Sequence, residues 1–217
     1  MSRVGIVPGA AVRSYVRPAV DALRERGIDA ELLPAPGQPG TPADLAEYGR
    51  ELAGRLDLAP VDLLVGLSVG AQAAAVAARA EPGAIGRLML VGPTVDPATR
   101  TAFRLVGRWI AGGRAEPGRL LADQLPDWWR AGPRRIAGVV RSSLDVEIER
   151  VLDPLPVPTD VVHAEHDQIT SHAYASRLAT GLGARLLLLP GASHSWPYRH
   201  ERAFADLIED VLKEHRS

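Results

Sequence analysis

The sequence contains no cysteine, and this absence excludes disulfides, thiolate metal sites and a cysteine nucleophile. It also lacks a long apolar run: its longest apolar stretches are far too short to span a bilayer, and none has the flanks of a secretory signal. A net charge of −1 gives no sign of a nucleic-acid binder. We therefore expect a cytoplasmic monomer or homodimer that acts on a small molecule and has no nucleic-acid or membrane partner.

The order of apolar patterns predicts an α/β fold. Apolar residues make up 46% of the chain, which is enough for one domain with a sizeable core. Short β-type runs alternate with helical patterns, an order typical of a parallel sheet with helices on both faces. The six expected strands are residues 3–8, 28–33, 61–67, 87–91, 159–164 and 185–189. Helices are expected over about 14–26, from Thr41-Pro42 to about Leu58, and at the C-terminus.

The segment 94–150 interrupts this alternation. Between residues 98 and 141 it carries nine arginines and three acidic residues, a net charge of +6. Three of the four tryptophans lie in it: Trp109, Trp128 and Trp129. Its helices are expected to break at Gly112-Gly113, Pro117-Gly118 and Gly132-Pro133. We interpret the segment as a helical cap inserted into a core formed by residues 1–93 and 151–217.

The most informative motif is Gly66-Leu67-Ser68-Val69-Gly70, which lies between the third apolar run and an alanine-rich stretch. A serine with glycine two residues away on each side, between a strand and a helix, is the layout of a nucleophile elbow. The pattern alone is weak, because ordinary glycine usage yields a chance match in roughly one such chain in ten. The strand before it and the helix after it therefore carry the prediction that Ser68 is a nucleophile.

A nucleophilic serine needs a base and a group that orients the base. His194 lies in the loop that directly follows the last expected strand, and Asp167 follows the fifth. Since carboxyl ends of parallel strands share one edge of the sheet, these residues are expected near Ser68. Asp96, after the fourth strand, is a rival for the acid, although a turn or helix cap before Pro97 is the favoured interpretation of it.

These residue types suit acyl transfer. Histidine titrates near neutrality, so it can take the serine proton and later protonate the leaving group, while the aspartate fixes the imidazole tautomer. The negative charge that develops on the substrate oxygen needs N–H donors. The backbone N–H groups of Val69 and of Ala10, in the loop after the first strand, are the expected pair.

Taken together, these motifs resemble the α/β-hydrolase fold superfamily in its small, cap-bearing form. The similarity covers nearly the whole chain and includes Pro8-Gly9-Ala10 as the oxyanion loop. It implies a mostly parallel sheet of about six strands, a serine nucleophile, no metal and no organic cofactor. The chain departs from the family where Pro8 replaces the usual histidine before the oxyanion glycine, and the family's first two strands are absent.

The resemblance implies hydrolysis of an ester, thioester, amide or carbon–carbon bond. We expect a serine hydrolase acting on a carboxylic ester, with Gly9, Trp109, Trp128 and Trp196 lining the substrate pocket. Because of the arginines in the cap, an anionic or carrier-bound substrate is a further possibility. The alternatives are a carbon–carbon bond hydrolase or a thioesterase using the same triad, and a nonhydrolytic, cofactor-free enzyme or ligand-binding protein of the same fold.

Overall fold

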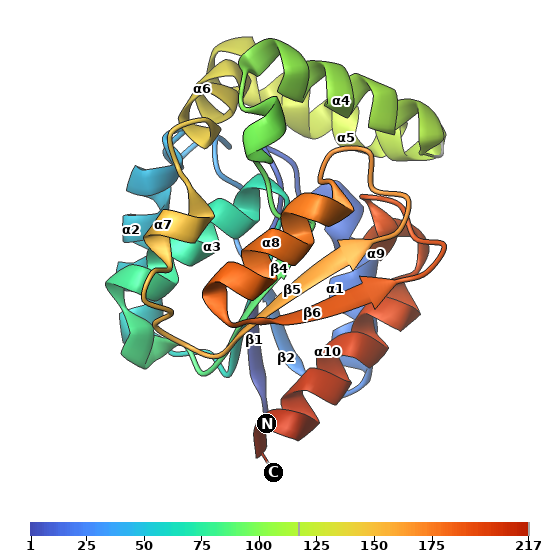
Figure 1. Ribbon diagram of the computed structural model, residues 1–217. Coiled ribbons are helices and arrows are strands. Elements are labelled where there is room, and N and C mark those ends of the chain that lie inside the picture. Colours follow the sequence, from blue (N-terminus) through green and yellow to red (C-terminus); the bar gives the residue numbers. More distant parts are fainter. Residues whose placement is uncertain (117, 217) are drawn as a thin grey trace.

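The computed structural model describes residues 1–116 and 118–216 and contains one six-stranded sheet, with every strand parallel to its neighbours (Figure 1). The order across the sheet is β2-β1-β3-β4-β5-β6. The strands are β1 (Arg3–Val7), β2 (Asp29–Leu32), β3 (Leu63–Leu67), β4 (Leu88–Val91), β5 (Thr159–Ala164) and β6 (Arg185–Leu189). Each coincides with an expected strand to within two residues at either end.

The position of each strand in the sheet explains its sequence pattern. The central strands β3, β4 and β5 are buried at every residue, because helices cover both faces; β3 and β4 read as continuous apolar runs, whereas β5 also buries Thr159, Asp160 and His163. The edge strand β2 alternates exposed and buried residues instead. β1 pairs with β2 on one side and β3 on the other, so the winding direction switches between β1 and β3. Ligands bind at the carboxyl ends of strands at such a point.

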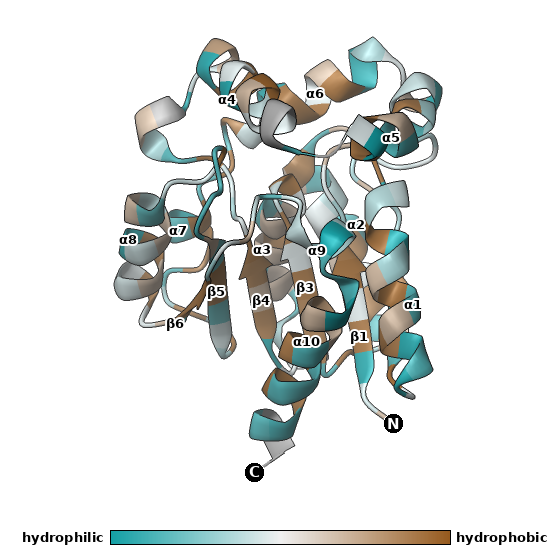
Figure 2. Ribbon diagram, turned by 90° about the vertical axis from the view of Figure 1, so that its right-hand side faces the viewer, coloured by the Kyte–Doolittle hydropathy of each residue, from teal (hydrophilic) through white to brown (hydrophobic). Residues whose placement is uncertain are grey.

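Two layers of helices enclose the sheet, and a third group lies above its carboxyl edge (Figure 1). The helices are α1 (Arg17–Glu25), α2 (Leu45–Leu58), α3 (Val69–Ala80), α4 (Ala102–Ala115), α5 (Gly118–Ala131), α6 (Pro133–Ser143), α7 (Ile148–Val151), α8 (His172–Leu182), α9 (Trp196–Arg199) and α10 (Glu201–Arg216). Buried residues of α1, α9 and α10 pack on one face, and those of α2, α3, α7 and α8 pack on the other. Figure 2 shows the apolar central strands between these layers.

Two helix boundaries differ from the sequence-based expectation. α2 begins at Leu45 rather than at Thr41-Pro42, because the Asp44 side chain accepts a hydrogen bond from the Glu47 amide and caps the helix. α4 continues through Gly112-Gly113, where a break was expected. A Cβ atom at Gly112 would lie 3.5 Å from Ile169 of the loop below, an ordinary van der Waals contact, so the helix tolerates this position without a break.

The remaining two expected breaks fall between the helices above the sheet. The expected break at Pro117-Gly118 lies where α4 gives way to α5, although Pro117 is outside the described residues. The break at Gly132-Pro133 is confirmed, with Gly132 at φ +76° between α5 and α6. We refer to α4, α5 and α6 as the cap. None of the described helices is long and apolar enough to cross a membrane.

Candidate active site

The turn between β3 and α3 holds Ser68 in a conformation that only small neighbours permit. Ser68 has φ +57° and ψ −121°, in a region that L-residues rarely adopt. A Cβ atom at Gly66 would lie 2.5 Å from the Cα of Ala71, and one at Gly70 would lie 2.5 Å from the carbonyl oxygen of Pro8. Both glycines are therefore required by sterics, as the elbow motif predicts, and Ser68 projects at the start of α3.

An imidazole–carboxylate pair lies at the same edge of the sheet. His194 Nδ1 is 2.7 Å from Asp167 Oδ2, and the imidazole is only 13% exposed. The other oxygen of Asp167 accepts hydrogen bonds of 2.8 Å from the amides of Ile169 and Thr170. With Oδ1 held in this way, Oδ2 is directed at the histidine, which keeps the Nδ1 proton and presents Nε2 as the basic nitrogen.

Local charge shifts the pKa of both partners. Burial lowers the pKa of His194, but the carboxylates of Asp167 and Glu116 outweigh it and raise that pKa above its ordinary value. Burial raises the pKa of Asp167, but His194 and the amides of Ile169 and Thr170 outweigh it and hold that pKa below its ordinary value. The two shifts favour an ionised carboxyl group beside an imidazole that binds its proton more tightly than usual.

Ser68 and His194 border the same cavity, and no hydrogen bond joins their side chains in the described part of the chain. Both line the cavity beneath the cap, and both also line a smaller adjoining one. Within the described part of the chain, the Ser68 hydroxyl makes no hydrogen bond. Serine–histidine contacts are often long in ligand-free structures and tighten when substrate binds. Gly92 leaves room for the His194–Asp167 pair, because a Cβ atom there would lie 3.0 Å from His194 Cε1 and 3.1 Å from Asp167 Oδ2.

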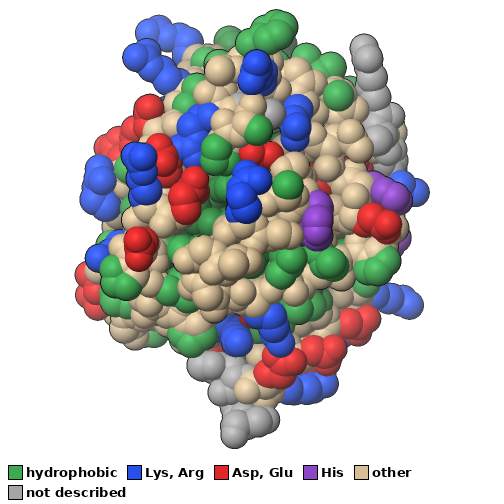
Figure 3. All heavy atoms as spheres, viewed as in Figure 1, with side chains coloured by type: hydrophobic (Ala, Val, Ile, Leu, Met, Phe, Trp, Pro, Cys, Tyr) green, Lys and Arg blue, Asp and Glu red, His purple; other side chains and the backbone are tan. Residues whose placement is uncertain are grey.

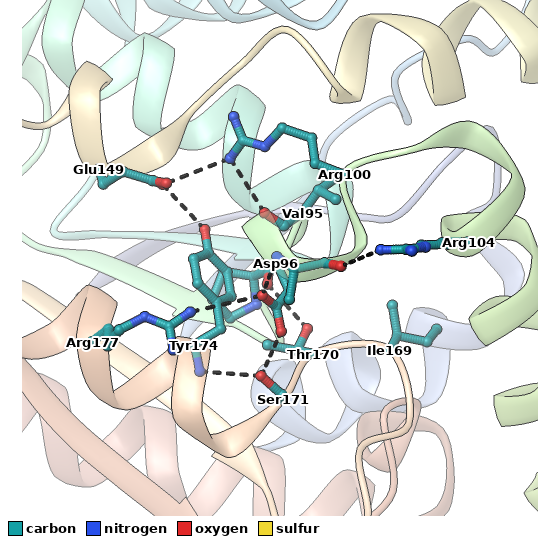
Figure 4. Close-up of polar contacts among 12 residues, drawn as sticks. Val95, Asp96, Arg100, Arg104, Glu149, Ile169, Thr170, Ser171, Tyr174 and Arg177 are labelled. Atoms are coloured by element: carbon teal, nitrogen blue, oxygen red, sulfur yellow. Dashed lines mark hydrogen bonds and ion pairs between the residues drawn. The ribbon is translucent and has the colours of Figure 1, made fainter.

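The rival carboxylate Asp96 belongs to a different set of contacts, shown in Figure 4. It accepts hydrogen bonds from the Ala98 amide, at 2.9 Å, and from the Ser171 hydroxyl, and it lies 3.8 Å from Arg177. Asp96 thus accepts a hydrogen bond within the turn that precedes α4 and links this turn to Ser171 at the start of α8. The carboxylate that contacts His194 is that of Asp167.

The loop after β1 provides a candidate oxyanion site. The Tyr15 hydroxyl accepts a hydrogen bond from the Gly9 amide at 3.2 Å, and Ala11, at φ +53°, donates its amide to the Pro36 carbonyl at 2.8 Å. Between these fixed points, the Ala10 amide has no acceptor among the described residues. Val69 is the first residue of α3, where an amide has no partner within the helix. Tyr15 thus steadies the loop that contains Pro8, Gly9 and Ala10.

An apolar cavity of about 90 Å³ lies between this loop, Ser68 and the cap. Gly9, Trp109 and Trp128, which we expect to line the substrate pocket, lie in its wall, and the two tryptophan rings pack edge to face with centroids 4.9 Å apart. The prediction for Trp196 was wrong, because its ring packs against Phe204 in the core on the α10 side and does not line the cavity. The helical turn of α9 rotates Trp196 inward, away from the loop that carries His194.

Sequence reasoning missed the carboxylates that join the cap to the catalytic loops. Glu116 Oε1 accepts the amide of Ser195, next to His194, at 3.1 Å. Asp127 Oδ2 accepts the amides of Arg13 and Ser14, just after the oxyanion loop, at 2.9 and 3.0 Å. The only available signal was the scarcity of acidic residues in an arginine-rich segment, and it does not reveal partners as many as 114 residues away.

Asp123 is the third such carboxylate: its Oδ2 accepts a hydrogen bond from the Tyr198 hydroxyl of α9 at 2.6 Å. A fourth polar contact comes from Trp128, whose Nε1 donates to the Ala10 carbonyl at 3.1 Å. The cap is therefore joined to the oxyanion loop and to the chain after His194. Among the described residues, no group of three or more His, Asp or Glu side chains is arranged to hold a metal ion.

Comparison with known proteins agrees with this architecture. The profile of the family described as "Alpha/beta hydrolase family" matches residues 6–207. No curated protein matches the chain in sequence. Among solved structures, the esterase EaEST from Exiguobacterium antarcticum is similar, with a TM-score of 0.81, 16% identity and coverage of 98% of this chain and 92% of that one.

Two further solved structures show the same fold. The hydrolase olei00960 from Oleispira antarctica has a TM-score of 0.80 and 11% identity, over 98% of this chain and 92% of that one. NosK from Streptomyces actuosus has a TM-score of 0.74 and 22% identity, over the full length of both chains. At these identities the likeness concerns the fold alone.

Proposed function

The protein belongs to the alpha/beta hydrolase family, and from this premise we propose that it is a serine hydrolase that cleaves carboxylic esters of small, uncharged, apolar acids. The observation that carries the proposal is the 2.7 Å contact between His194 and Asp167 beside a cavity that Ser68 also lines. A hydroxyl, an imidazole and a carboxylate at one sheet edge are the parts that acyl transfer through a serine requires.

The first chemical step begins at Ser68. As its Oγ attacks the ester carbonyl carbon, His194 Nε2 takes the hydroxyl proton, and Asp167 stabilises the imidazolium that forms. The same nitrogen then returns the proton to the leaving alkoxide, which leaves an acyl group on Ser68. Water, activated by His194 in turn, hydrolyses that acyl-enzyme and regenerates the free serine.

The amides of Ala10 and Val69 are the proposed donors to the tetrahedral oxyanion. Neither amide has an acceptor among the described residues, and both residues line the cavity, one in the loop after β1 and the other in the first turn of α3. The positive end of the α3 dipole adds to the stabilisation. Removal of one such donor costs about 3–4 kcal/mol of transition-state stabilisation in well-studied hydrolases.

The cavity supports a restricted substrate class. Its described lining contains no arginine, lysine, aspartate or glutamate, so an anionic group inside it would find no cationic partner. An apolar cavity of roughly 150 Å³ holds a benzene ring. The cavity under the cap, at about 90 Å³, therefore suits a short acyl group better than an aromatic one.

Labelling with a fluorophosphonate tests the mechanism directly. We expect a covalent adduct that peptide mapping assigns to Ser68, and its loss in the Ser68→Ala variant. Because the reagent needs an activated serine but no particular substrate, the result does not depend on the identity of the ester. Absence of labelling, or an adduct at another serine, would contradict the proposal.

A substrate panel separates the proposed ester hydrolysis from its alternatives. Short-chain nitrophenyl esters should be turned over faster than coenzyme A thioesters of the same acyl group and faster than vinylogous diketones. Turnover confined to thioesters or to carbon–carbon bonds would assign the same residues to a different reaction. Tight binding of an ester without turnover would indicate a ligand-binding protein of this fold.

A further inference from the structure

The outer side of the cap exposes large apolar side chains. Phe103 of α4 and Trp129 of α5 are each 89% exposed. Three smaller apolar side chains on the same two helices are also exposed: Ile110, Leu121 and Leu125. A soluble surface seldom presents several bulky apolar residues on adjoining helices unless the surface is used for binding.

These residues form a stripe on each helix. Leu121, Leu125 and Trp129 recur every four residues and so lie along one side of α5. Phe103 and Ile110, seven residues apart, lie along one side of α4 in the same way.

The two helices that carry the stripes also line the cavity, through other side chains. Trp128 precedes Trp129 and packs against Trp109 of α4, and both rings line the cavity. The stripes and the cavity lining therefore belong to different sides of the same two helices.

The cap also exposes arginines, and its acidic residues make contacts of their own. Among the described side chains, the exposed arginines are Arg104 of α4, Arg119 and Arg130 of α5, and Arg134 and Arg141 of α6. Glu116, Asp123 and Asp127 accept hydrogen bonds from the chain below the cap, as described above, and Asp127 also pairs with Arg130 at 3.1 Å. Figure 3 shows apolar and basic side chains together over the cap, at the top of the molecule. The net charge of the whole chain is −1, so the positive charge of the cap is not evident from the total.

The charge of this face decides between its candidate partners. A second copy of the chain would bring arginines against arginines, which repel each other at short range. An anionic partner is complementary. Two amphipathic helices that carry Trp, Phe and Leu between arginines have the composition of segments that lie in the headgroup region of anionic membranes. An acidic protein would instead need a packed, closely complementary interface.

We propose that the outer face of the cap, with the apolar stripes of α4 and α5 and the exposed arginines of α4, α5 and α6, docks on an anionic lipid surface. The apolar stripes enter the headgroup boundary, and the arginines contact lipid phosphates. Docking in this orientation places the cavity against the lipid phase, from which an apolar ester could enter. The proposal concerns binding and stands whether or not Ser68 proves to be the nucleophile.

Vesicle flotation with the full-length protein tests the docking. We expect the protein to float with vesicles of phosphatidylglycerol and phosphatidylcholine at low salt. It should remain unbound with phosphatidylcholine alone, and the bound fraction should fall as salt is raised. The Ser68→Ala variant should bind like the wild type, which keeps the result independent of catalysis.

Matched variants locate the binding face. The double variant Leu125→Ser/Trp129→Ser should bind more than tenfold more weakly, since the apolar contact is lost. Leu188→Ser is its control, because Leu188 of β6 is 54% exposed, similar to Leu125 at 53%, and lies away from the cap. Arg119→Gln/Arg134→Gln should bind on the order of 20-fold more weakly, at about fivefold per arginine. Arg50→Gln, on α2, should bind normally.

Three outcomes would overturn the proposal. The first is failure to bind either kind of vesicle. The second is equal binding by the cap variants and their controls, with thermal midpoints showing that all are folded. The third is selective retention by an acidic protein surface but not by anionic vesicles, which would assign the face to a protein partner.

Discussion

His194 Nδ1 lies 2.7 Å from Asp167 Oδ2, although 27 residues separate the two in the chain. The pair forms because β5 and β6 are adjacent parallel strands whose following loops meet at one edge of the sheet. The contact favours the tautomer with the proton on Nδ1, and His194 lines the same cavity as Ser68. The proposed activity should depend on this contact and on the groups around His194. Variants of these residues should differ in kcat, in the pH dependence of kcat/KM and in thermal stability.

The two carboxylates near the site should respond differently to the same substitution. Asp167→Asn should lower kcat by about 10⁴, because an amide favours the wrong imidazole tautomer. Asp96→Asn should change kcat by less than tenfold and act on stability, since Asp96 contacts Ser171 and Arg177 rather than His194. Steady-state kinetics and thermal unfolding of both variants decide the point. If Asp96→Asn alone removed activity, the acid would be misassigned.

The pH dependence of kcat/KM should report the charge around His194. The charged or titratable groups that act on its imidazole are Asp167, Glu116 and His163. Because the net effect raises the pKa of His194 and catalysis needs the neutral ring, the acid limb should lie above the ordinary value of about 6.5. Glu116→Gln removes a negative charge and should move this limb to lower pH.

Glu165→Gln is the matched control for that shift. Glu165 also accepts an amide of the histidine loop, that of Gly191 at 2.7 Å, but it does not act on the pKa of His194. Its substitution should leave the acid limb in place. Equal shifts in Glu116→Gln and Glu165→Gln would indicate a loop effect rather than a charge effect.

Gly92→Ala should impair catalysis more than folding. The added methyl group would lie about 3 Å from both His194 and Asp167, and Gly92 has φ +52°, which disfavours a side chain. We expect at least a 100-fold loss of kcat with a folded protein. Gly54→Ala, on α2 with no atom within 4 Å of the new methyl, should keep full activity and gain about 0.5–1 kcal/mol of stability.

Trp109→Ala should broaden acyl specificity. The indole lines the cavity and packs on Trp128, so its removal enlarges a space of about 90 Å³. Esters with acyl chains two to four carbons longer than the wild-type optimum should gain in relative kcat/KM. Leu58→Ala, at a position 86% exposed on α2, should leave the chain-length profile unchanged. An unaltered profile in Trp109→Ala would place the acyl group elsewhere.

Asp127 should contribute stability that acid removes. Burial raises the pKa of this carboxyl, but the amides of Arg13 and Ser14 outweigh it and hold the pKa below its ordinary value. Its stabilising effect is therefore complete above the unfolded-state pKa of about 3.9, and it is lost as pH falls toward the folded-state value.

The Asp127→Ala variant makes this measurable. It should lose about 2 kcal/mol at pH 7, because two hydrogen bonds to a charged group disappear. This corresponds to a midpoint lowered by roughly 4–8 °C for a domain of this size. The midpoints of wild type and variant should approach each other only as pH falls below about 4 toward the folded-state pKa of Asp127. Asp57→Ala, an exposed change on α2, should shift the midpoint by less than about 2 °C.

The sheet could be predicted from the sequence because its signals are local. β5 and β6 begin and end at the expected residues, since each is a compact apolar run bounded by turn residues. The elbow was equally visible, because Gly66 and Gly70 are required by contacts within a few residues of Ser68 and by the adjacent β1. The order of the strands then brought the loops of Asp167 and His194 to the same edge.

The errors arise where a distant contact overrides a local preference. Gly112-Gly113 was expected to end a helix, but α4 continues through both residues to Ala115, and its Gly112 faces the loop of Ile169. Trp196 was expected in the pocket from its nearness to His194, whereas one turn of helix directs it into the core. Glu116 was missed because its partner, the Ser195 amide, lies 79 residues away.

At Ser68, the positive φ angle lowers stability, whereas the proposed chemistry needs the hydroxyl group that this residue carries. A glycine would occupy φ +57° without the strain of about 1–3 kcal/mol that a side chain carries there. A laboratory evolution experiment that rewards heat resistance alone would thus be drawn toward deleting the hydroxyl. Any selection for higher thermal stability in this protein therefore has to measure turnover together with stability.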